Sequence, residues 1–156
     1  MYVYIDADHM YDCRDCLVFV RALGEIFMQL TKHTDFALRC LMYVAALKNQ
    51  RLATISEIAQ HFSIPRNHLM KVVNQLGRLG YIQTTRGPKG GITLGKNIDE
   101  IILADLIRDF ESRLDPVNCD DPICPIKGAC ELKRALQKAQ QAFLDELEGY
   151  SLADLV

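Results

Sequence analysis

Three cysteines in the last third of the chain are spaced closely enough to bind a single metal centre. Cys119, Cys124 and Cys130 fall within one stretch that prolines and a glycine break into a loop. Thiolates are soft ligands that suit zinc or an iron-sulfur cluster. A structural zinc site needs four protein ligands and usually begins with a C-x2-C pair, but this stretch has no such pair, and no histidine follows His68. The spacing favours an iron-sulfur cluster with incomplete cysteine ligation, with zinc or three unligated thiols as alternatives.

Cys130 is expected at the start of the last helix, where the helix dipole lowers the pKa of a thiol. Positive charges that would offset an anionic cluster are supplied nearby by Lys127, Lys133 and Arg134. The other cysteines give weaker signals. Cys13 and Cys16 form an isolated C-x-x-C pair, which has little specificity by itself. Cys40 falls within the apolar pattern of a helix and is expected to pack in the core.

The helix predicted after the Ser63-Ile-Pro65 break, with Ser63 as its N-cap, has two opposed faces. Its apolar stripe is formed by Leu69, Val72, Val73 and Leu76. The opposite face carries side chains suited to base edges or phosphates, and we expect DNA contacts from Arg66, Asn67, His68 and Lys71. A solvated helix face without a ligand is the alternative. The glycine-rich turn that follows favours DNA, because its cations Arg86 and Lys89 suit the minor groove or flanking phosphates.

The charge of the chain is unevenly distributed, although its net value is only −2. Residues 49–96 hold seven basic side chains and one acidic side chain, a net charge of +6. Residues 97–156 hold six basic and thirteen acidic side chains, a net charge of −7. A basic middle beside an acidic tail is expected if only the middle meets a polyanion.

The elements that must position these residues make a mainly α fold with a small β-hairpin wing: a winged helix-turn-helix plus a long C-terminal dimerisation helix. A capping box at Thr54-Ile-Ser-Glu57 starts a short helix that ends near Phe62, and Gly80 ends the helix with opposed faces. Apolar spacing predicts three further helices over 34–47, 98–111 and 131–148, and β-prone runs predict two strands over 81–85 and 92–94.

We expect three regions along the chain. Residues 1–27 are an N-terminal extension outside the fold, residues 28–96 the DNA-binding domain, and residues 97–156 the cluster-binding loop and dimerisation helices. The last helix has a narrow apolar stripe at near-heptad spacing, formed by Leu132, Leu136, Ala139, Phe143 and Leu147. We expect this stripe to pair across the axis of a homodimer, and packing on its own domain is the alternative. No stretch is long enough for a membrane span or reads as an export signal, so we expect a cytoplasmic protein.

With these motifs placed, the chain resembles the winged-helix iron-sulfur regulators, and among them the nitric-oxide-sensitive repressors. The resemblance runs from Met28 to Val156. Its specific parts are the segments 28–35, 65–68, 86–91 and 151–156 and the C-x4-C-x5-C spacing of the cysteines. It implies a homodimer that binds double-stranded operator DNA when loaded with a 2Fe-2S or 4Fe-4S cluster. It also implies that the protein releases the operator when its cluster reacts with nitric oxide. Genes for protection against nitrosative stress are then no longer repressed.

The resemblance further suggests that Asp35 is the fourth cluster ligand and reaches the cluster of the partner subunit. The alternative is an acid that stabilises the N-terminus of its own helix. Two other functions remain open: a regulator that senses iron-sulfur supply or general redox state, and an electron-transfer or cluster-carrier protein, which would have no need of a basic helix and wing. We do not expect an enzyme, because no catalytic set of residues is evident.

Overall fold

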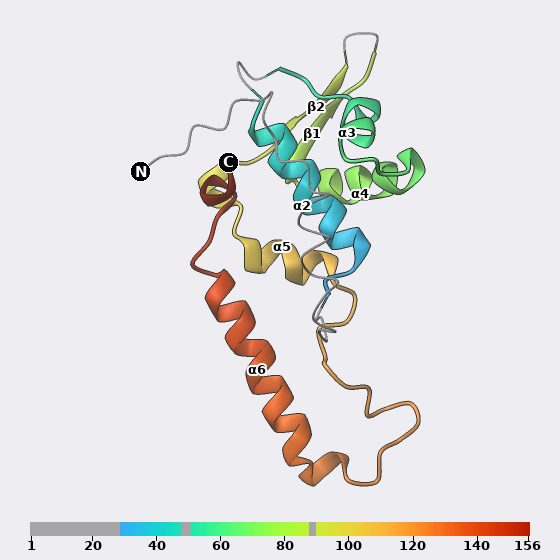
Figure 1. The fold of residues 1–156 in the computed structure, drawn as a ribbon, viewed down its shortest axis with the longest axis vertical. Helices are drawn as coiled ribbons and strands as arrows, with labels where there is room; N and C mark the ends of the chain where they lie inside the picture. Colours follow the sequence, from blue (N-terminus) through green and yellow to red (C-terminus); the bar gives the residue numbers. More distant parts are fainter. Residues whose placement is uncertain (1–28, 48–50, 88–89) are drawn as a thin grey trace, which may run out of the picture.

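The computed structural model describes residues 29–47, 51–87 and 90–156. The predicted N-terminal extension and the Cys13-x-x-Cys16 pair lie outside these residues, as do Met28 and Lys89. The described part contains five α-helices and one two-stranded hairpin, as the sequence predicts (Figure 1). In chain order the elements are α2 (Lys32–Ala45), α3 (Ile55–His61), α4 (Arg66–Arg78), β1 (Ile82–Thr85), β2 (Gly91–Leu94), the 3-10 helix η2 (Ile98–Glu100), α5 (Leu103–Phe110), the 3-10 helix η3 (Lys127–Ala129), α6 (Glu131–Leu147) and the 3-10 helix η4 (Leu152–Leu155).

The helix-turn-helix is formed by α3 and α4. The capping box at the start of α3 is confirmed: the Thr54 hydroxyl accepts from the Glu57 amide, and the Glu57 carboxylate accepts from the Thr54 amide. The prediction that Ser63 caps α4 is wrong. Ser63 has a φ of 53° and lies in the turn, and Pro65 occupies the N-cap of α4. The reason is packing, because the next residue, Ile64, is buried in the core and its amide donates to the Ala59 carbonyl at 2.9 Å, which closes the turn before α4 begins.

The hairpin follows α4 directly. Gly80 ends the helix with a φ of 77°, as predicted, and β1 then pairs antiparallel with β2 from Ile82↔Leu94 to Thr85↔Gly91. The hairpin is also tied to the segment before α3, since Ala53 and Ile92 exchange two backbone hydrogen bonds of 3.0 and 2.7 Å. A Cβ atom at Gly91 would lie only 2.7 Å from the Ala53 carbonyl oxygen, so this close approach requires glycine.

The single helix predicted over 98–111 is wrong. It is divided into η2 and α5, because Ile101 and Ile102 leave the helical conformation. These residues instead pair with the C-terminal segment: the Ile101 carbonyl accepts from the Leu152 amide at 2.8 Å, and the Leu103 amide donates to the Tyr150 carbonyl at 3.0 Å. Ile101 and Leu152 are both fully buried, so this pairing brings the end of the chain into the core.

One hydrophobic core lies between α2, α3, α4, α5, the hairpin and η4. Its largest fully buried side chains come from every one of these elements and include Leu41, Ile58, Leu69, Leu76, Ile82, Leu106 and Leu152. Leu106 and Leu152 follow residue 96. Residues 97–156, which we expect to carry the cluster and the dimer contact, therefore also supply part of the core of the DNA-binding domain.

Helix α6 extends away from this core, and the loop that joins α5 to α6 runs from the end of α5 to the distant end of α6 (Figure 1). Leu144 is the buried residue of α6. The predicted stripe is more open: Leu132 is 64% exposed, Ala139 is exposed, and Leu136, Phe143 and Leu147 are half-buried. An apolar stripe that the described part of the chain leaves partly uncovered is available to another protein surface.

Candidate nucleic-acid interface and cysteine loop

Helix α4 has the two opposed faces that the sequence predicts. Leu69, Val72, Val73 and Leu76 are buried, and they fix the helix against α2 and α3. The residues predicted to contact DNA all lie on the exposed face: Arg66, Asn67, His68 and Lys71. The dominance of the apolar contacts on one side leaves this face free of contacts within the core, as a recognition helix requires. Contact with DNA stays a prediction.

The hairpin places a second set of positive charge near α4. Arg86 is exposed directly after β1, and Gly87 follows with a φ of 118°, which turns the chain. A Cβ atom at Gly90 would lie 2.1 Å from the Thr85 carbonyl oxygen, so the tight turn depends on that glycine. Lys89, the other cation predicted here, lies outside the described residues.

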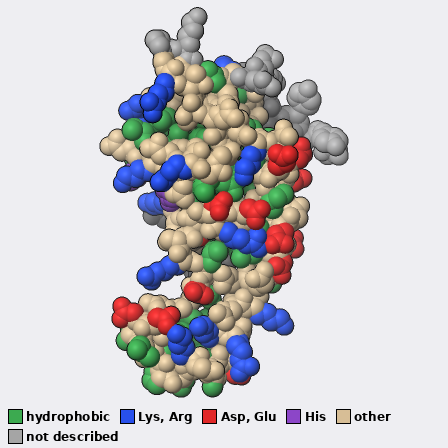
Figure 2. All heavy atoms as spheres, turned by 180° about the vertical axis from the view of Figure 1, so that it is seen from behind, with side chains coloured by type: hydrophobic (Ala, Val, Ile, Leu, Met, Phe, Trp, Pro, Cys, Tyr) green, Lys and Arg blue, Asp and Glu red, His purple; other side chains and the backbone are tan. Residues whose placement is uncertain are grey.

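Positive and negative side chains gather on different sides of the winged helix. Figure 2 shows Lys and Arg side chains along one side of the winged helix and Asp and Glu side chains along the other. Arg66, Lys71, Arg78 and Arg86 form no ion pair with a described residue. Their charges therefore remain available to a polyanion. Arg78 and Lys96 are further exposed cations of this segment that the site prediction left out.

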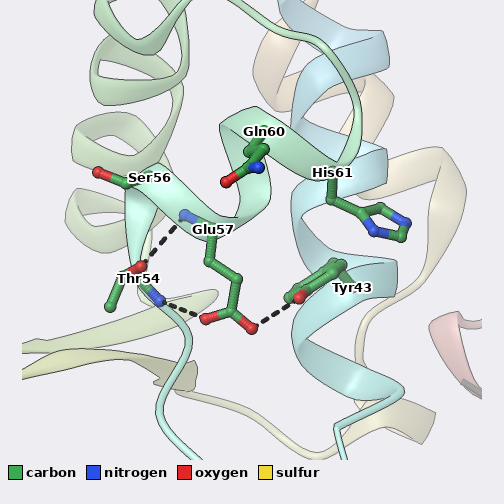
Figure 3. A pocket seen from close by; sticks show the side chains of 6 residues that line it. All are labelled: Tyr43, Thr54, Ser56, Glu57, Gln60 and His61. Carbon is green, nitrogen blue, oxygen red and sulfur yellow. Dashed lines mark hydrogen bonds between the residues drawn. The ribbon is translucent and has the colours of Figure 1, made fainter.

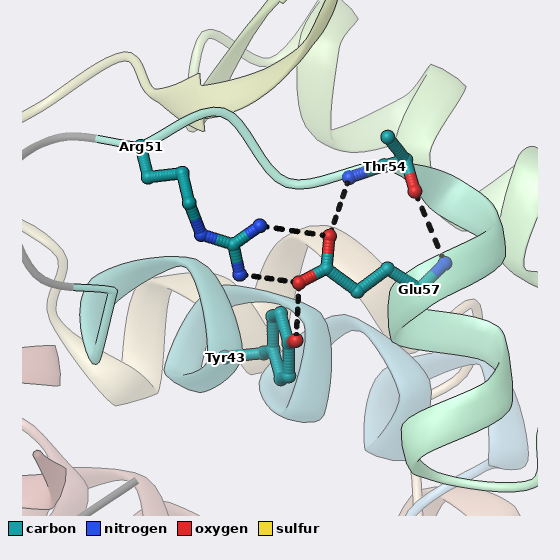
Figure 4. A network of polar contacts seen from close by, with 4 residues as sticks. All are labelled: Tyr43, Arg51, Thr54 and Glu57. Atoms are coloured by element: carbon teal, nitrogen blue, oxygen red, sulfur yellow. Dashed lines mark hydrogen bonds and ion pairs between the residues drawn. The ribbon is translucent and has the colours of Figure 1, made fainter.

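Arg51 differs from these cations, because an acid of the same chain neutralises it. Its guanidinium contacts both carboxylate oxygens of Glu57, and the Tyr43 hydroxyl donates to the same carboxylate at 2.7 Å (Figure 4). The hydrogen bond from Arg51 is the main cause that lowers the pKa of Glu57 to about 2. This network joins α2 to the start of α3, and so fixes the position of the helix-turn-helix on the core.

A shallow depression beside this network has no catalytic arrangement (Figure 3). It is lined by Tyr43, Thr54, Ser56, Glu57, Gln60 and His61. Its carboxylate, that of Glu57, already accepts from Arg51, Tyr43 and the Thr54 amide. An acid held by three donors and with a lowered pKa is a poor proton acceptor near neutral pH.

The cysteine loop is locally ordered by its own polar contacts. The Asn118 side chain accepts from the amides of Asp120 and Asp121 at 3.1 and 3.3 Å, and the Cys124 amide donates to the Cys119 carbonyl at 3.1 Å. The Lys127 ammonium pairs with the Asp120 carboxylate. Cys119 is buried, whereas Cys124 and Cys130 are half-buried.

Cys130 occupies the N-cap of α6, as expected from the sequence, and its Sγ accepts from the Lys133 amide at 3.4 Å. An amide donor and a helix N-terminus both stabilise a thiolate. The thiols of Cys119, Cys124 and Cys130 are all free, and their chemistry fits a soft metal centre. Among residues 29–47, 51–87 and 90–156, however, no three potential ligands come together in one group.

Asp35 lies in the first turn of α2, and among the described residues it forms no common group of potential metal ligands with the cysteines of its own chain. Both of its carboxylate oxygens accept from Nε of Arg39, at 2.9 and 3.0 Å, and the pair is half-exposed. The i, i+4 spacing of the two residues is a signal for this pair that the sequence analysis did not use. Within one chain the structure does not bring Asp35 to the predicted thiol ligands.

Cys40 is fully buried within the core, which confirms the predicted packing role. Burial raises the pKa of its thiol to about 12. A thiol held in its protonated form by burial is a poor metal ligand. Cys40 therefore provides a natural control for the three cysteines of the loop.

Comparison with known proteins identifies the group to which this architecture belongs. Residues 30–156 match the model of the Rrf2 family, described as an iron-dependent transcriptional regulator. The chain belongs to the Rrf2 family of transcriptional regulators. Members of this family are regulators of transcription, not enzymes.

Solved structures of similar fold support the winged-helix architecture of this Rrf2 chain. The global cysteine regulator CymR of B. subtilis matches with a TM-score of 0.68 and 24% identity, over 83% of this chain and 96% of CymR. The IscR protein of T. potens matches with a TM-score of 0.66 and 18% identity, over 86% of this chain and 88% of IscR. The oxidised form of CymR from Staphylococcus aureus matches with a TM-score of 0.63 and 23% identity, over 80% of this chain and 93% of that protein.

The helices described in the structure include none that is both long and apolar enough to cross a membrane.

Proposed function

We propose that this Rrf2 regulator is a homodimeric repressor whose affinity for operator DNA depends on an iron-sulfur cluster held by its cysteine loop. The observation that carries the proposal is the position of that loop. It joins α5, which packs in the core of the winged helix, to α6, which presents an uncovered apolar stripe. A change in the loop therefore acts on the two elements that set the orientation of one DNA-binding domain relative to its partner.

The DNA-binding part of the proposal rests on α4 and the wing. Arg66, Asn67, His68 and Lys71 read the major groove, while Arg86 and Lys89 contact the minor groove or flanking phosphates. A dimer formed through α6 presents two such surfaces, and its half-sites would lie about one helical turn apart, roughly 10 base pairs.

The cluster part rests on the donor set. Cys119, Cys124 and Cys130 would hold the cluster, and Asp35 of α2 would supply the fourth ligand in the partner subunit. In the structure both oxygens of that carboxylate accept from Arg39, so binding to iron would compete with this contact. When bound, the cluster supplies an iron centre that reacts with nitric oxide. A carboxylate is a hard donor for this soft centre, so Asp35 would be the ligand that a small molecule displaces most readily.

Nitric oxide is proposed as the signal because the chain resembles the nitric-oxide-sensitive repressor NsrR. The support comes from the C-x4-C-x5-C spacing and from the segments 28–35, 65–68, 86–91 and 151–156. A regulator of iron-sulfur supply or of redox state would use the same residues. The reaction of the cluster-loaded protein with nitric oxide therefore distinguishes the signals.

The test of cluster binding is anaerobic purification of the full chain, followed by an absorption spectrum and by iron and sulfide analysis. We expect iron and sulfide in equal amounts in the parent, and neither after replacement of Cys119, Cys124 or Cys130 by Ser. Cys40→Ala is the matched control and should retain the cluster, because that thiol is buried. A parent without sulfide, or three Ser variants with the full iron content, would contradict the proposal.

A further inference from the structure

Three consecutive residues at the C-terminal end of α5 contact three different parts of the DNA-binding domain. Glu111 accepts from the Thr31 amide and from the Thr34 hydroxyl, both at 2.7 Å, and so holds the N-terminus of α2. The Phe110 ring lies 5.4 Å from the His33 ring, between centroids. Asp109 contacts Gln75 of α4 and Tyr81 at the start of the wing. The end of α5 is therefore a junction of the domain.

Gln75 connects this junction to the recognition helix. It lies on α4 between the buried stripe and the exposed face, and its side-chain amide donates to the Asp109 carbonyl at 3.0 Å. Because its nitrogen is the donor in that contact, its oxygen is the acceptor for His33 Nε2, at 2.9 Å. One side chain thus bridges α2, α4 and α5, so a rotation of α4 large enough to move Gln75 would disturb its two hydrogen bonds.

Tyr81 connects the same junction to the base of the wing. It lies between the end of α4 and β1, is almost completely buried, and donates its hydroxyl to the Asp109 carboxylate at 2.7 Å. Burial and this hydrogen bond raise the pKa of Tyr81 well above its usual range. The Lys96 ammonium, just after β2, lies 4.2 Å above the Tyr81 ring. Asp109 is therefore connected through Tyr81 to the residues that flank the two strands, directly before β1 and just after β2.

The cysteine loop begins where this junction ends. Glu111 is the C-cap of α5, and Cys119 follows in the same unbroken loop, so a rearrangement around the cysteines acts first on the end of α5. We infer that Gln75, Tyr81 and Asp109 are positioning residues that transmit the state of the cysteine loop to the recognition helix and the wing. This inference rests on the proposed function, since it requires that the loop change with the state of its cluster.

The test compares the operator affinity of cluster-loaded and cluster-free protein in a pair of matched variants. Tyr81→Phe removes only the hydroxyl that contacts Asp109, whereas Asp109→Asn keeps an oxygen that accepts from Tyr81. The coupling between two sites of one protein is typically about 5- to 150-fold in affinity. We expect the ratio of the two affinities to fall several-fold towards one in Tyr81→Phe and to stay near the parent value in Asp109→Asn.

A second readout separates transmission from stability. In the parent, loss of the cluster should change the hydrogen-exchange rates of the amides of β1 and of the last turn of α4; in Tyr81→Phe it should not. A Tyr81→Phe protein with a lower melting temperature but an unchanged affinity ratio and the parent's exchange response would overturn this inference alone. A parent whose affinity is the same with and without the cluster would overturn the proposed function, and this inference with it.

Discussion

Glu57 is the one acid in the basic segment 49–96, and the structure gives it a structural role. The sequence predicts its part in the capping box of α3. It does not predict the contacts with Arg51 and Tyr43, because Tyr43 lies on α2 and meets Glu57 only when the two helices pack. These contacts make the carboxylate part of the support for the helix-turn-helix.

Glu57 should make the stability of the fold depend on pH. Its pKa in the folded protein is lowered to about 2 from its ordinary value of 4.5, mainly by the hydrogen bond from Arg51. A lowered folded pKa stabilises the native state fully above the unfolded pKa, and this contribution is lost as the pH falls from about 4.5 towards 2. We expect the free energy of unfolding, measured with urea, to fall less steeply over this range in Glu57→Gln than in the parent. Glu146→Gln, at an exposed position of α6, is the control and should keep the pH dependence of the parent. An equal pH dependence in the parent and in Glu57→Gln would refute the role of Glu57.

Arg66 and Lys89 test the DNA-binding surface. Because Arg66 is exposed at the start of α4, Arg66→Ala should weaken binding to a selected operator by on the order of 1 to 3 kcal/mol and relax its specificity. Lys89→Ala should weaken binding to many sequences more evenly. Fluorescence anisotropy with selected and random duplexes measures both effects, and Lys138→Ala on α6 is the control. If both variants bind the operator as tightly as the parent at moderate salt, the surface is wrongly assigned.

At the scale of the elements, the sequence predicts those helix ends, turns and strands that depend on neighbouring residues. The capping box of α3, the glycine that ends α4 and the β-prone strands of the wing were all predictable from residues close together in the chain. The division of 98–111 was not, because Ile101 and Ile102 leave the helix to pair with residues 150–152. Nor was the Gln75 bridge, since its partners come from α2 and α5.

Helix α6 tests the proposed assembly. The uncovered stripe around Leu136 and Phe143 predicts a two-fold dimer, and replacing both residues by Asp should give monomers. Sedimentation of the anaerobically purified, cluster-loaded protein at micromolar concentration measures this. The double variant Gln137→Asp and Lys138→Asp, on another face of α6, should remain dimeric. A parent that sediments as a monomer under these conditions would remove the dimer from the proposal.

For the whole molecule, the proposed cluster site is divided between the cysteine loop of one subunit and α2 of its partner. Sequence spacing places the three cysteines on one loop, but it cannot show how a loop and α2 of different subunits meet. Asp35 tests this arrangement: Asp35→Ala should retain the cysteine-bound cluster while altering its lifetime and its rate of reaction with nitric oxide. Stopped-flow absorption measures that rate, and Asp99→Ala in η2 is the control. An unchanged rate and lifetime would leave Asp35 with only its contact to Arg39.

The most direct test of the central claim is an anaerobic titration of cluster-loaded protein with nitric oxide, in which cluster absorbance and operator binding are followed in the same samples. If the loop controls the DNA-binding surface, operator affinity should fall in step with the loss of cluster absorbance, by a factor within the range of about 5- to 150-fold typical of coupled sites. Cluster-free protein should bind the operator as weakly as fully reacted protein. Undiminished operator binding after the cluster has reacted completely would contradict the account, even if the iron content were confirmed.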